Sequence, residues 1–222
     1  SKGEGLGNQF LANIREVDAI CHVIRCFDND DITHVNNKID PINDIEVIET
    51  ELMLSDLDSL EKRKLSIEKK SKSGDKEAKL MLNIIIKIIE KLENGIPARE
   101  ISFSNEEMPI VKLLNILTIK PVLFVANVDE NSATNGNDYS KKLSDLGLSK
   151  GITTITMSAK LESEISEISD TIERKEFLTA LDLEESGLEK LTKAGYELLN
   201  LITYFTAGPK EVRAWTIKNG TI

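Results

Sequence analysis

The residues with the most specific chemistry lie at the end of one apolar run, in the sequence PVLFVANVDE (residues 121–130). The run is short enough to be a buried strand, and Asn127, Asp129 and Glu130 stand where that strand would end. Amide and carboxylate groups in such a loop can recognise the edge of a purine base. The sequence Asn-Lys-x-Asp in this place selects guanine, but here Val128 replaces the lysine and Glu130 the final aspartate. The pattern predicts a purine-reading loop and leaves its base preference open.

The two replacements bear directly on that preference. Guanine presents two adjacent donors to an aspartate, whereas adenine presents an acceptor and a donor, and a good bidentate contact contributes roughly 1–3 kcal/mol of discrimination. The additional methylene of Glu130 displaces the carboxylate from the position that fits guanine. Val128 removes the aliphatic stem and the charge of lysine from the wall on which the base stacks. The competing interpretation is that these four residues are simply a polar loop after a strand.

One of the two histidines could take part in catalysis. His34 lies in the loop FDNDDITHV, just past an expected strand end, where a neutral imidazole near pH 7 can orient a water molecule. A lone histidine in a loop can equally be a solvated residue. His22 alternates within an apolar strand and is expected to pack in the core. Asp28, Asp30 and Asp31 of the same loop lack a further ligand set, so we expect them to face solvent and not to bind a metal.

The two cysteines are expected to stay unpaired. Cys21 and Cys26 lie five residues apart in the apolar run AICHVIRCF, so on a strand they point to opposite faces and are roughly 16 Å from each other. Unpaired cysteines fit a reducing compartment. We expect both to be small buried hydrophobic residues; the alternative is a redox sensor.

The composition is that of an ordinary soluble protein with a sizeable core. The chain has 222 residues, of which 40% are hydrophobic and 30% charged, enough for one large domain and a smaller unit. No apolar run approaches the ~18 residues that cross a bilayer, and no secretory signal opens the chain. We therefore expect a cytoplasmic protein with no membrane partner. The net charge of −10 argues against nonspecific nucleic-acid binding by the whole surface.

Positive charge is nevertheless concentrated in one segment. Residues 62–79 contain eight bases and three acids, a local net charge of +5, so the remainder of the chain carries −15. The bases are Lys62, Arg63, Lys64, Lys69, Lys70, Lys72, Lys76 and Lys79. Such a cluster can bind RNA phosphates or another acidic partner. The alternative is that the charges only solvate a long helical segment.

This basic segment lies between two expected helices. Asp40-Pro41 marks the start of a long helix, because proline is favoured in a first helical turn. Apolar residues then recur at helical spacing until the turn at residues 71–75, and a second helix ends at Asn94-Gly95. Two helices of similar length joined by a short turn predict an antiparallel hairpin. The hairpin is an insertion within one domain, with the basic cluster at its tip.

The other segments predict an α/β domain around the hairpin. The glycine-rich residues 1–7 are expected to form a loop that leads into a helix, and residues 19–27 a strand covered on both faces. A capping box at residues 104–107 opens a helix to about residue 115. Further strands are expected at 122–126 and 152–157, and further helices at about 171–181 and 187–201. The alternating stretch 211–217 is β-like, with no partner strand identified.

Taken together, four blocks resemble a known family. They are SKGEGLGNQFLANIRE at the start, RCFDNDDITHV, the loop NVDE, and TYFTAGPKEVRAWT. These blocks are similar to those of the Obg-like ATPase (YchF) family of P-loop NTPases, bacterial type, and they extend nearly from end to end. The resemblance implies an α/β P-loop NTPase fold, a mostly parallel sheet with flanking helices, with an inserted antiparallel coiled-coil helical hairpin and the start of a β-grasp TGS domain.

The resemblance also implies the domain boundaries. Residues 1–40 and 101–204 would be the two parts of the nucleotide-binding domain, residues 41–100 the hairpin, and residues 205–222 the start of a truncated TGS domain. Family members carry a Gly-x-x-x-x-Gly-Lys-Ser phosphate loop, a magnesium-binding threonine and an Asp-x-x-Gly motif upstream of the position that matches Ser1. We therefore expect an internal portion of a longer protein, inactive by itself.

The function implied is that of a nucleotide-dependent switch. Such a protein binds and hydrolyses ATP, prefers ATP to GTP, and uses Mg²⁺ whose ligands would lie upstream of this chain. Its coupling to the ribosome or other RNA would use the hairpin tip and the TGS domain. The alternatives are a non-catalytic module that binds ribosomes or nucleic acid, and a GTPase.

Site roles follow from the same resemblance. Asn127 would buttress the base loop, the backbone of Val128 would contact adenine, and Ser158 and Ala159, in the sequence Ser-Ala-Lys, would belong to a second base-contacting loop. His34 would replace the usual water-positioning glutamine. Glycines would let a switch segment move toward the γ-phosphate and away after cleavage. The switch glycines are Gly3, Gly5 and Gly7.

Overall fold

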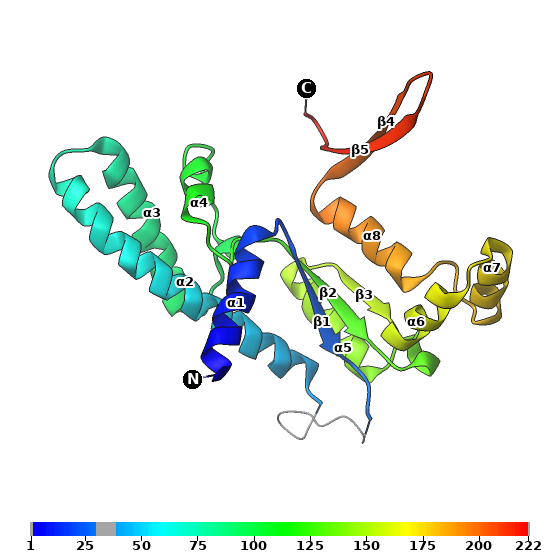
Figure 1. The fold of residues 1–222 in the computed structure, drawn as a ribbon. Helices are drawn as coiled ribbons and strands as arrows, with labels where there is room; N and C mark the ends of the chain where they lie inside the picture. The colour runs from blue at the N-terminus through cyan, green and yellow to red at the C-terminus, as the bar shows by residue number, and fades with distance from the viewer. Residues whose placement is uncertain (1, 30–38, 222) are drawn as a thin grey trace. The chain divides into compact units, whose positions relative to one another are not determined.

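The computed structural model describes residues 2–29 and 39–221, which divide into a helical unit and a unit that contains the sheet (Figure 1). The helical unit comprises Ser1–Asp18 and Ile45–Lys120, and the sheet unit comprises Ala19–Asp44 and Pro121–Ile222. This division differs from the expected boundaries. The first helix and residues 101–120 belong with the hairpin, because they pack and hydrogen-bond there.

The predicted hairpin is confirmed. Helix α2 spans Pro41–Lys72 and helix α3 spans Lys76–Glu93, and they lie side by side in Figure 1. The Asp75 side chain caps α3 by accepting hydrogen bonds from the backbone N–H groups of residues 77 and 78. Gly95, the second residue after α3, has a φ of 73°, a conformation that favours glycine. These two signals begin and end α3 where the sequence predicts.

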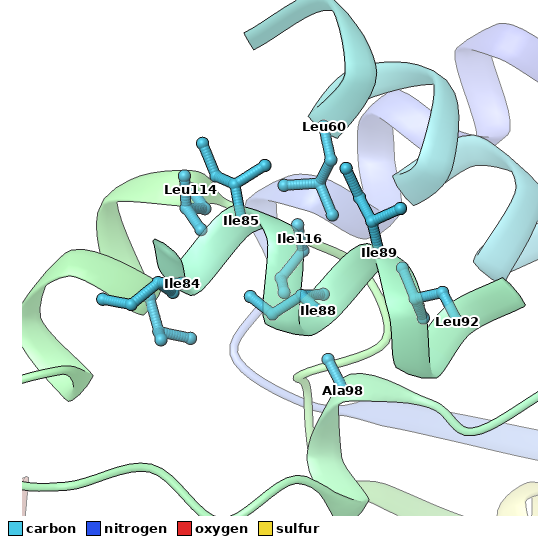
Figure 2. Close-up of a cluster of buried hydrophobic side chains, with 10 residues drawn as sticks. Leu60, Ile84, Ile85, Ile88, Ile89, Leu92, Ala98, Leu114 and Ile116 are labelled. Atoms are coloured by element: carbon cyan, nitrogen blue, oxygen red, sulfur yellow. The ribbon is translucent and has the colours of Figure 1, made fainter. Parts of the chain in front are cut away.

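The core of the helical unit lies along one face of α3 (Figure 2). Leu60 of α2, Ala98, and Leu114 and Ile116 near the end of α4 close over this face. The buried residues of α3 itself are Ala78, Ile84, Ile85, Ile88, Ile89 and Leu92. Since full burial of one such isoleucine or leucine contributes about 1.5–3 kcal/mol, this cluster is a main source of the unit's stability.

Three shorter elements complete the helical unit. They are α1 (Lys2–Glu16), the 3-10 turn η1 (Ala98–Glu100) and α4 (Met108–Leu114). The predicted capping box before α4 is present, because the Ser104 N–H donates to Glu107 Oε2 at 2.7 Å and the Glu107 N–H donates to Ser104 Oγ at 3.2 Å. The glycine-rich start is not the expected loop. Gly3, Gly5 and Gly7 lie within α1, whose helical periodicity extends through this segment.

A buried carboxylate joins α2 to the segment that leads into the sheet. Asp56 is fully buried, and its oxygens accept hydrogen bonds from the Leu117 N–H at 2.7 Å, the Thr118 N–H at 2.8 Å and the Thr118 hydroxyl at 2.7 Å. The Arg15 guanidinium lies 3.8 Å from the same carboxylate. Burial raises the pKa of Asp56, although these hydrogen bonds and Arg15 oppose the shift. Asp56 is therefore an internal anchor.

Within the described residues the main sheet has three parallel strands in the order β1-β2-β3. They are β1 (Ile20–Arg25), β2 (Val122–Asn127) and β3 (Thr154–Met157). The central strand β2 is buried along nearly its whole length, as expected for a strand with helices on both faces. The carboxyl ends of β2 and β3 coincide, because Asn127 pairs with Met157.

Two helices pack on opposite faces of this sheet. Helix α5 (Asp138–Lys150) approaches β3 through Gly147, where an added Cβ would meet Thr154 Oγ1. Helix α8 (Gly187–Leu198) approaches through Gly187, where an added Cβ would lie 2.5 Å from Met157 Cβ. Residues 154 and 157 are three apart and point to opposite faces of a strand. The other helices are α6 (Ala159–Glu167) and α7 (Thr171–Ala180).

The expectation that the 211–217 stretch lacks a partner is wrong. Strand β4 (Leu201–Ala207) pairs antiparallel with β5 (Val212–Lys218), and nearly all of their residues are exposed. The predicted last helix stops three residues early, because Asn200 adopts a φ of 52° after α8. The sequence Leu201–Ala207 then forms a strand.

Strand β1 is also less covered than predicted. The Val23 side chain is 58% exposed and Cys21 is exposed, because helices α5 and α8 pack on β2 and β3. Cys26 is buried as expected, and burial raises the pKa of its thiol to about 12. Both cysteines are free, as predicted. His22 packs edge to face against Phe124 at 6.2 Å, and burial lowers its pKa, which confirms a packed histidine.

None of the described helices combines the length and the apolar character needed to cross a bilayer.

Candidate purine-binding site

The two predicted base loops lie next to each other at the carboxyl ends of β2 and β3. Asn127 ends β2, and its Oδ1 accepts a hydrogen bond from the Ala159 N–H at 2.9 Å. The Val128 N–H donates to the Met157 carbonyl at 2.9 Å. The side chain of Asn127 and the backbone of Val128 therefore tie the first loop to the second. The role of Asn127 in supporting a base loop stays a prediction, to which this hydrogen bond gives a geometry.

Val128 can contribute to a site here only through its backbone. Its side chain is 2% exposed, so it fills the core below the loop and does not form a wall for a base. Its N–H is already bonded to the Met157 carbonyl, which leaves the Val128 carbonyl as the backbone group that can face a ligand. A carbonyl accepts hydrogen bonds, and the exocyclic amino group of adenine donates them.

Asp129 holds the shape of the loop. It precedes the 3-10 turn η2 (Glu130–Ser132), and its carboxylate accepts from the Ser132 N–H at 3.2 Å and the Ser132 hydroxyl at 2.9 Å. These contacts cap the turn, as aspartate does at helix N-termini. The turn fixes the direction in which Glu130 leaves the backbone.

The Glu130 carboxylate forms an ion pair with the Lys160 ammonium group of the second loop. This hydrogen-bonded ion pair lowers the pKa of Glu130 and raises that of Lys160. Both groups reach solvent, with 70% of the Lys160 side chain exposed. The sequence placed Lys160 in the second loop but did not predict this pairing, because the two residues are 30 positions apart.

The second loop is a helix start. Ser158 is buried, and its hydroxyl and carbonyl accept from the N–H groups of Leu161 at 3.4 Å and Glu162 at 3.0 Å, so it caps α6. The Ala159 N–H, in the predicted second base-contacting loop, donates to Asn127 Oδ1. Ala159 thus positions the first loop.

Contacts from Asn137 and Tyr139 hold the segment that follows β1 next to this site. The Asn137 side-chain amide donates to the Cys26 carbonyl at 2.7 Å, while its Oδ1 accepts from the Ser140 N–H at 3.0 Å. The Tyr139 hydroxyl lies 3.3 Å from Asp28, which is exposed as predicted. His34, Asp30 and Asp31 fall outside the described residues, so the catalytic role of His34 stays a prediction.

The remaining predicted site residues belong to other elements of the fold. The switch glycines lie in α1, in the helical unit. No group of three or more His, Cys, Asp or Glu side chains among residues 2–29 and 39–221 is placed to hold a metal ion.

The basic cluster divides into two parts on the hairpin. Lys62 and Arg63 line a groove together with α1 residues, and Lys62 pairs with Asp58 at 2.6 Å. The other part surrounds the turn between α2 and α3, where the side chains are exposed. These tip residues are Lys69, Lys70, Lys72, Lys76 and Lys79. Lys64 lies between the two parts and pairs with Glu61 at 3.4 Å.

The described strands form a parallel sheet with flanking helices, and neighbouring strand ends carry an Asn-x-x-Glu loop and a Ser-Ala-Lys loop. This arrangement, together with the structural match given below, places the chain in the P-loop NTPase class. No protein-family model matched the chain. It is 51% identical over 220 residues to the ribosome-binding ATPase YchF of Haemophilus influenzae and 49% identical over 222 residues to that of Bacillus subtilis. The chain belongs to the YchF family of Obg-like P-loop NTPases.

A solved structure agrees with this assignment. The YchF GTPase of Schizosaccharomyces pombe superposes with a TM-score of 0.85 at 36% sequence identity, over 96% of this chain and 58% of that chain. The two curated relatives are covered over 99% of this chain. The chain spans 60% of the length of each of them.

Proposed function

We propose that the protein is a nucleotide-dependent switch that binds and hydrolyses ATP in preference to GTP. The observation that carries this proposal is the pair of base loops, joined by the Asn127–Ala159 hydrogen bond and the Glu130–Lys160 ion pair. The Val128 N–H is used by the Met157 carbonyl, so the Val128 carbonyl is the backbone group through which this residue would bind a base. Adenine offers a matching donor at its amino group, whereas guanine has a carbonyl oxygen in that place.

The state of Glu130 supports the same preference. A guanine-reading carboxylate must accept two donors from one base edge. In this chain the carboxylate is engaged with Lys160, and its charge is partly neutralised there. It is therefore poorly suited to bind guanine with both oxygens, and it is less repulsive toward the ring acceptor of adenine.

The proposed hydrolysis needs groups that hold the phosphates and Mg²⁺. The sequence contains no Gly-x-x-x-x-Gly-Lys-Ser motif, so residues beyond this chain would hold the phosphates and Mg²⁺. Mg²⁺ would supply charge stabilisation at the phosphates. The relatives are named a ribosome-binding ATPase in Haemophilus influenzae and a GTPase in Schizosaccharomyces pombe, so the base preference needs a direct measurement.

Calorimetric titration of the full-length protein with ATP and with GTP tests the proposal. We expect ATP to bind more tightly, by a factor of about ten or more, since one good base contact contributes roughly 1–3 kcal/mol. A protein that binds GTP more tightly would contradict the ATP preference. A protein that binds neither nucleotide would contradict the nucleotide-dependent function as a whole.

We also propose that nucleotide binding is coupled to docking on the ribosome or other RNA. The exposed lysines at the hairpin tip support this, because they are placed on the protruding end of α2 and α3 in an otherwise acidic chain. The bacterial relatives carry the name ribosome-binding ATPase. The salt dependence of RNA binding tests this second function.

A further inference from the structure

The second base loop is hydrogen-bonded, through the first turn of α6, to the start of helix α8. Glu162 lies in the first turn of α6, and its carboxylate accepts from the Gly187 N–H at 2.6 Å and the Leu188 N–H at 3.0 Å. Gly187 and Leu188 are the first two residues of α8. The first N–H groups of a helix have no partner inside it, and a carboxylate is favoured at this end. The partner here comes from a different helix.

Close packing makes this contact rigid. Gly187 is buried, and an added Cβ would lie 2.5 Å from Met157 Cβ and 2.9 Å from Glu162 Oε1. Met157 ends β3, and its carbonyl accepts the Val128 N–H. The start of α8 thus contacts the end of β3 and the first turn of α6 at once. Both base loops are attached to these two elements.

The start of α8 also has a cap of its own. Ser186 Oγ accepts from the Glu189 N–H at 3.2 Å, and Glu189 Oε2 accepts from the Ser186 N–H at 2.9 Å, which is a complete capping box. Glu189 therefore stabilises α8 locally. Glu162 satisfies two further N–H groups and, unlike Glu189, links α8 to the helix that carries Ser158, Ala159 and Lys160.

We propose that Glu162 is a positioning residue for purine binding. It fixes the position of the second base loop by hydrogen-bonding α6 to the N-terminus of α8. The inference rests on the proposed nucleotide-binding function and adds a residue that does not touch the base. Without Glu162, α6 can shift relative to β3. The Ala159 N–H and Lys160 then lose their fixed positions opposite Asn127 and Glu130.

The test compares Glu162→Ala with Glu189→Ala in the full-length protein. Both variants remove a carboxylate that caps α8, but only the first removes the link to α6. We expect Glu162→Ala to raise the Kd and the KM for ATP about tenfold with kcat unchanged, the low end of the ~10–100-fold losses seen when outer-shell partners of metal ligands are removed. Glu189→Ala should lower the melting temperature and leave the Kd unchanged.

A third variant covers the case in which Glu162→Ala does not fold. Glu162→Gln keeps one acceptor oxygen, so its Kd should lie between those of the wild type and the alanine variant. Equal Kd values in the Glu162 and Glu189 variants, with normal ATP binding by the wild type, would overturn the positioning role and leave the proposed function intact. Loss of ATP binding in the wild type itself would overturn both.

Discussion

At the scale of single residues, the site depends on contacts between groups that are far apart in the sequence. The motif predicts a purine-reading loop at Asn127–Glu130, and the structure shows how that loop is held. The sequence could not show that the Ala159 N–H is used by Asn127, since that contact spans 32 positions. It also could not show that Lys160 engages Glu130. These contacts decide which groups remain available to bind the base.

Replacing Lys160 with methionine tests whether the ion pair affects base preference. Methionine keeps the length and apolar character of the stem but cannot pair with Glu130. The freed carboxylate would face adenine with its full charge and could turn toward the donors of guanine. We expect the ratio of GTP to ATP affinity in the full-length protein to rise about two- to fivefold, a range that fits an exposed ion pair.

Lys193→Met is a matched control for this measurement. Lys193 forms a similar ion pair with Glu185, and its side chain is 68% exposed, close to the 70% of Lys160. That pair lies at α8 and includes no residue of either base loop. The control should leave the affinity ratio unchanged. An identical ratio in wild type and Lys160→Met would show that the pair plays no part in base choice.

At the scale of elements, the sequence predicted the helices that strong local signals specify. It did not predict features that depend on weaker signals or on packing against other elements. The hairpin followed from a long apolar stripe, a proline start and a glycine stop, all of which are local. Strand β4 was missed because its apolar residues continue the pattern of α8, and only Asn200 at a φ of 52° separates them. Helix α5 was missed because its capping box at Asn137 was not recognised. The exposure of β1 depends on which strands the helices cover.

The hairpin tip gives a prediction at this scale. Reversing the charge of Lys69, Lys70 and Lys72 to glutamate should weaken RNA binding by the full-length protein, because each lysine that contacts a phosphate releases counterions on binding. The slope of log K against log salt should fall by about 0.7–0.9 for each phosphate that the variant no longer neutralises. Filter binding to ribosomes or to ribosomal RNA over a salt series measures this slope.

The control reverses three exposed lysines outside the hairpin, Lys112, Lys141 and Lys175. It changes the net charge by the same amount, so any effect of overall charge appears in both variants. Lys62 and Lys64 are left intact, since they lie about 12–15 Å from the end of α2 and already pair with acids. Equal slopes in both variants would support the view that the tip charges only solvate the hairpin.

At the scale of the whole molecule, the points where the chain leaves the helical unit carry a cluster of polar contacts within that unit. It leaves the helical unit after residues 18 and 120. The Lys120 ammonium group donates to the carbonyls of Arg15 at 3.0 Å and Val17 at 2.6 Å, so the two departing segments are tied together. Arg15 in turn donates to the Asn115 carbonyl at 2.9 Å. Asp56 is the buried acceptor at the centre of these contacts.

Asp56→Ala should therefore destabilise the chain more than an ordinary surface change. It removes the acceptor of two backbone N–H groups and one hydroxyl that are buried with it, and a buried donor left without a partner costs about 1–3 kcal/mol. We expect the free energy of unfolding, measured with urea and circular dichroism, to fall by at least about 2 kcal/mol. Asp58→Ala, two residues further on and 67% exposed, should change it by no more than about 0.5 kcal/mol. Equal losses in the two variants would show that the buried carboxylate contributes no more than a surface residue, and that the departing segments are held mainly by apolar packing.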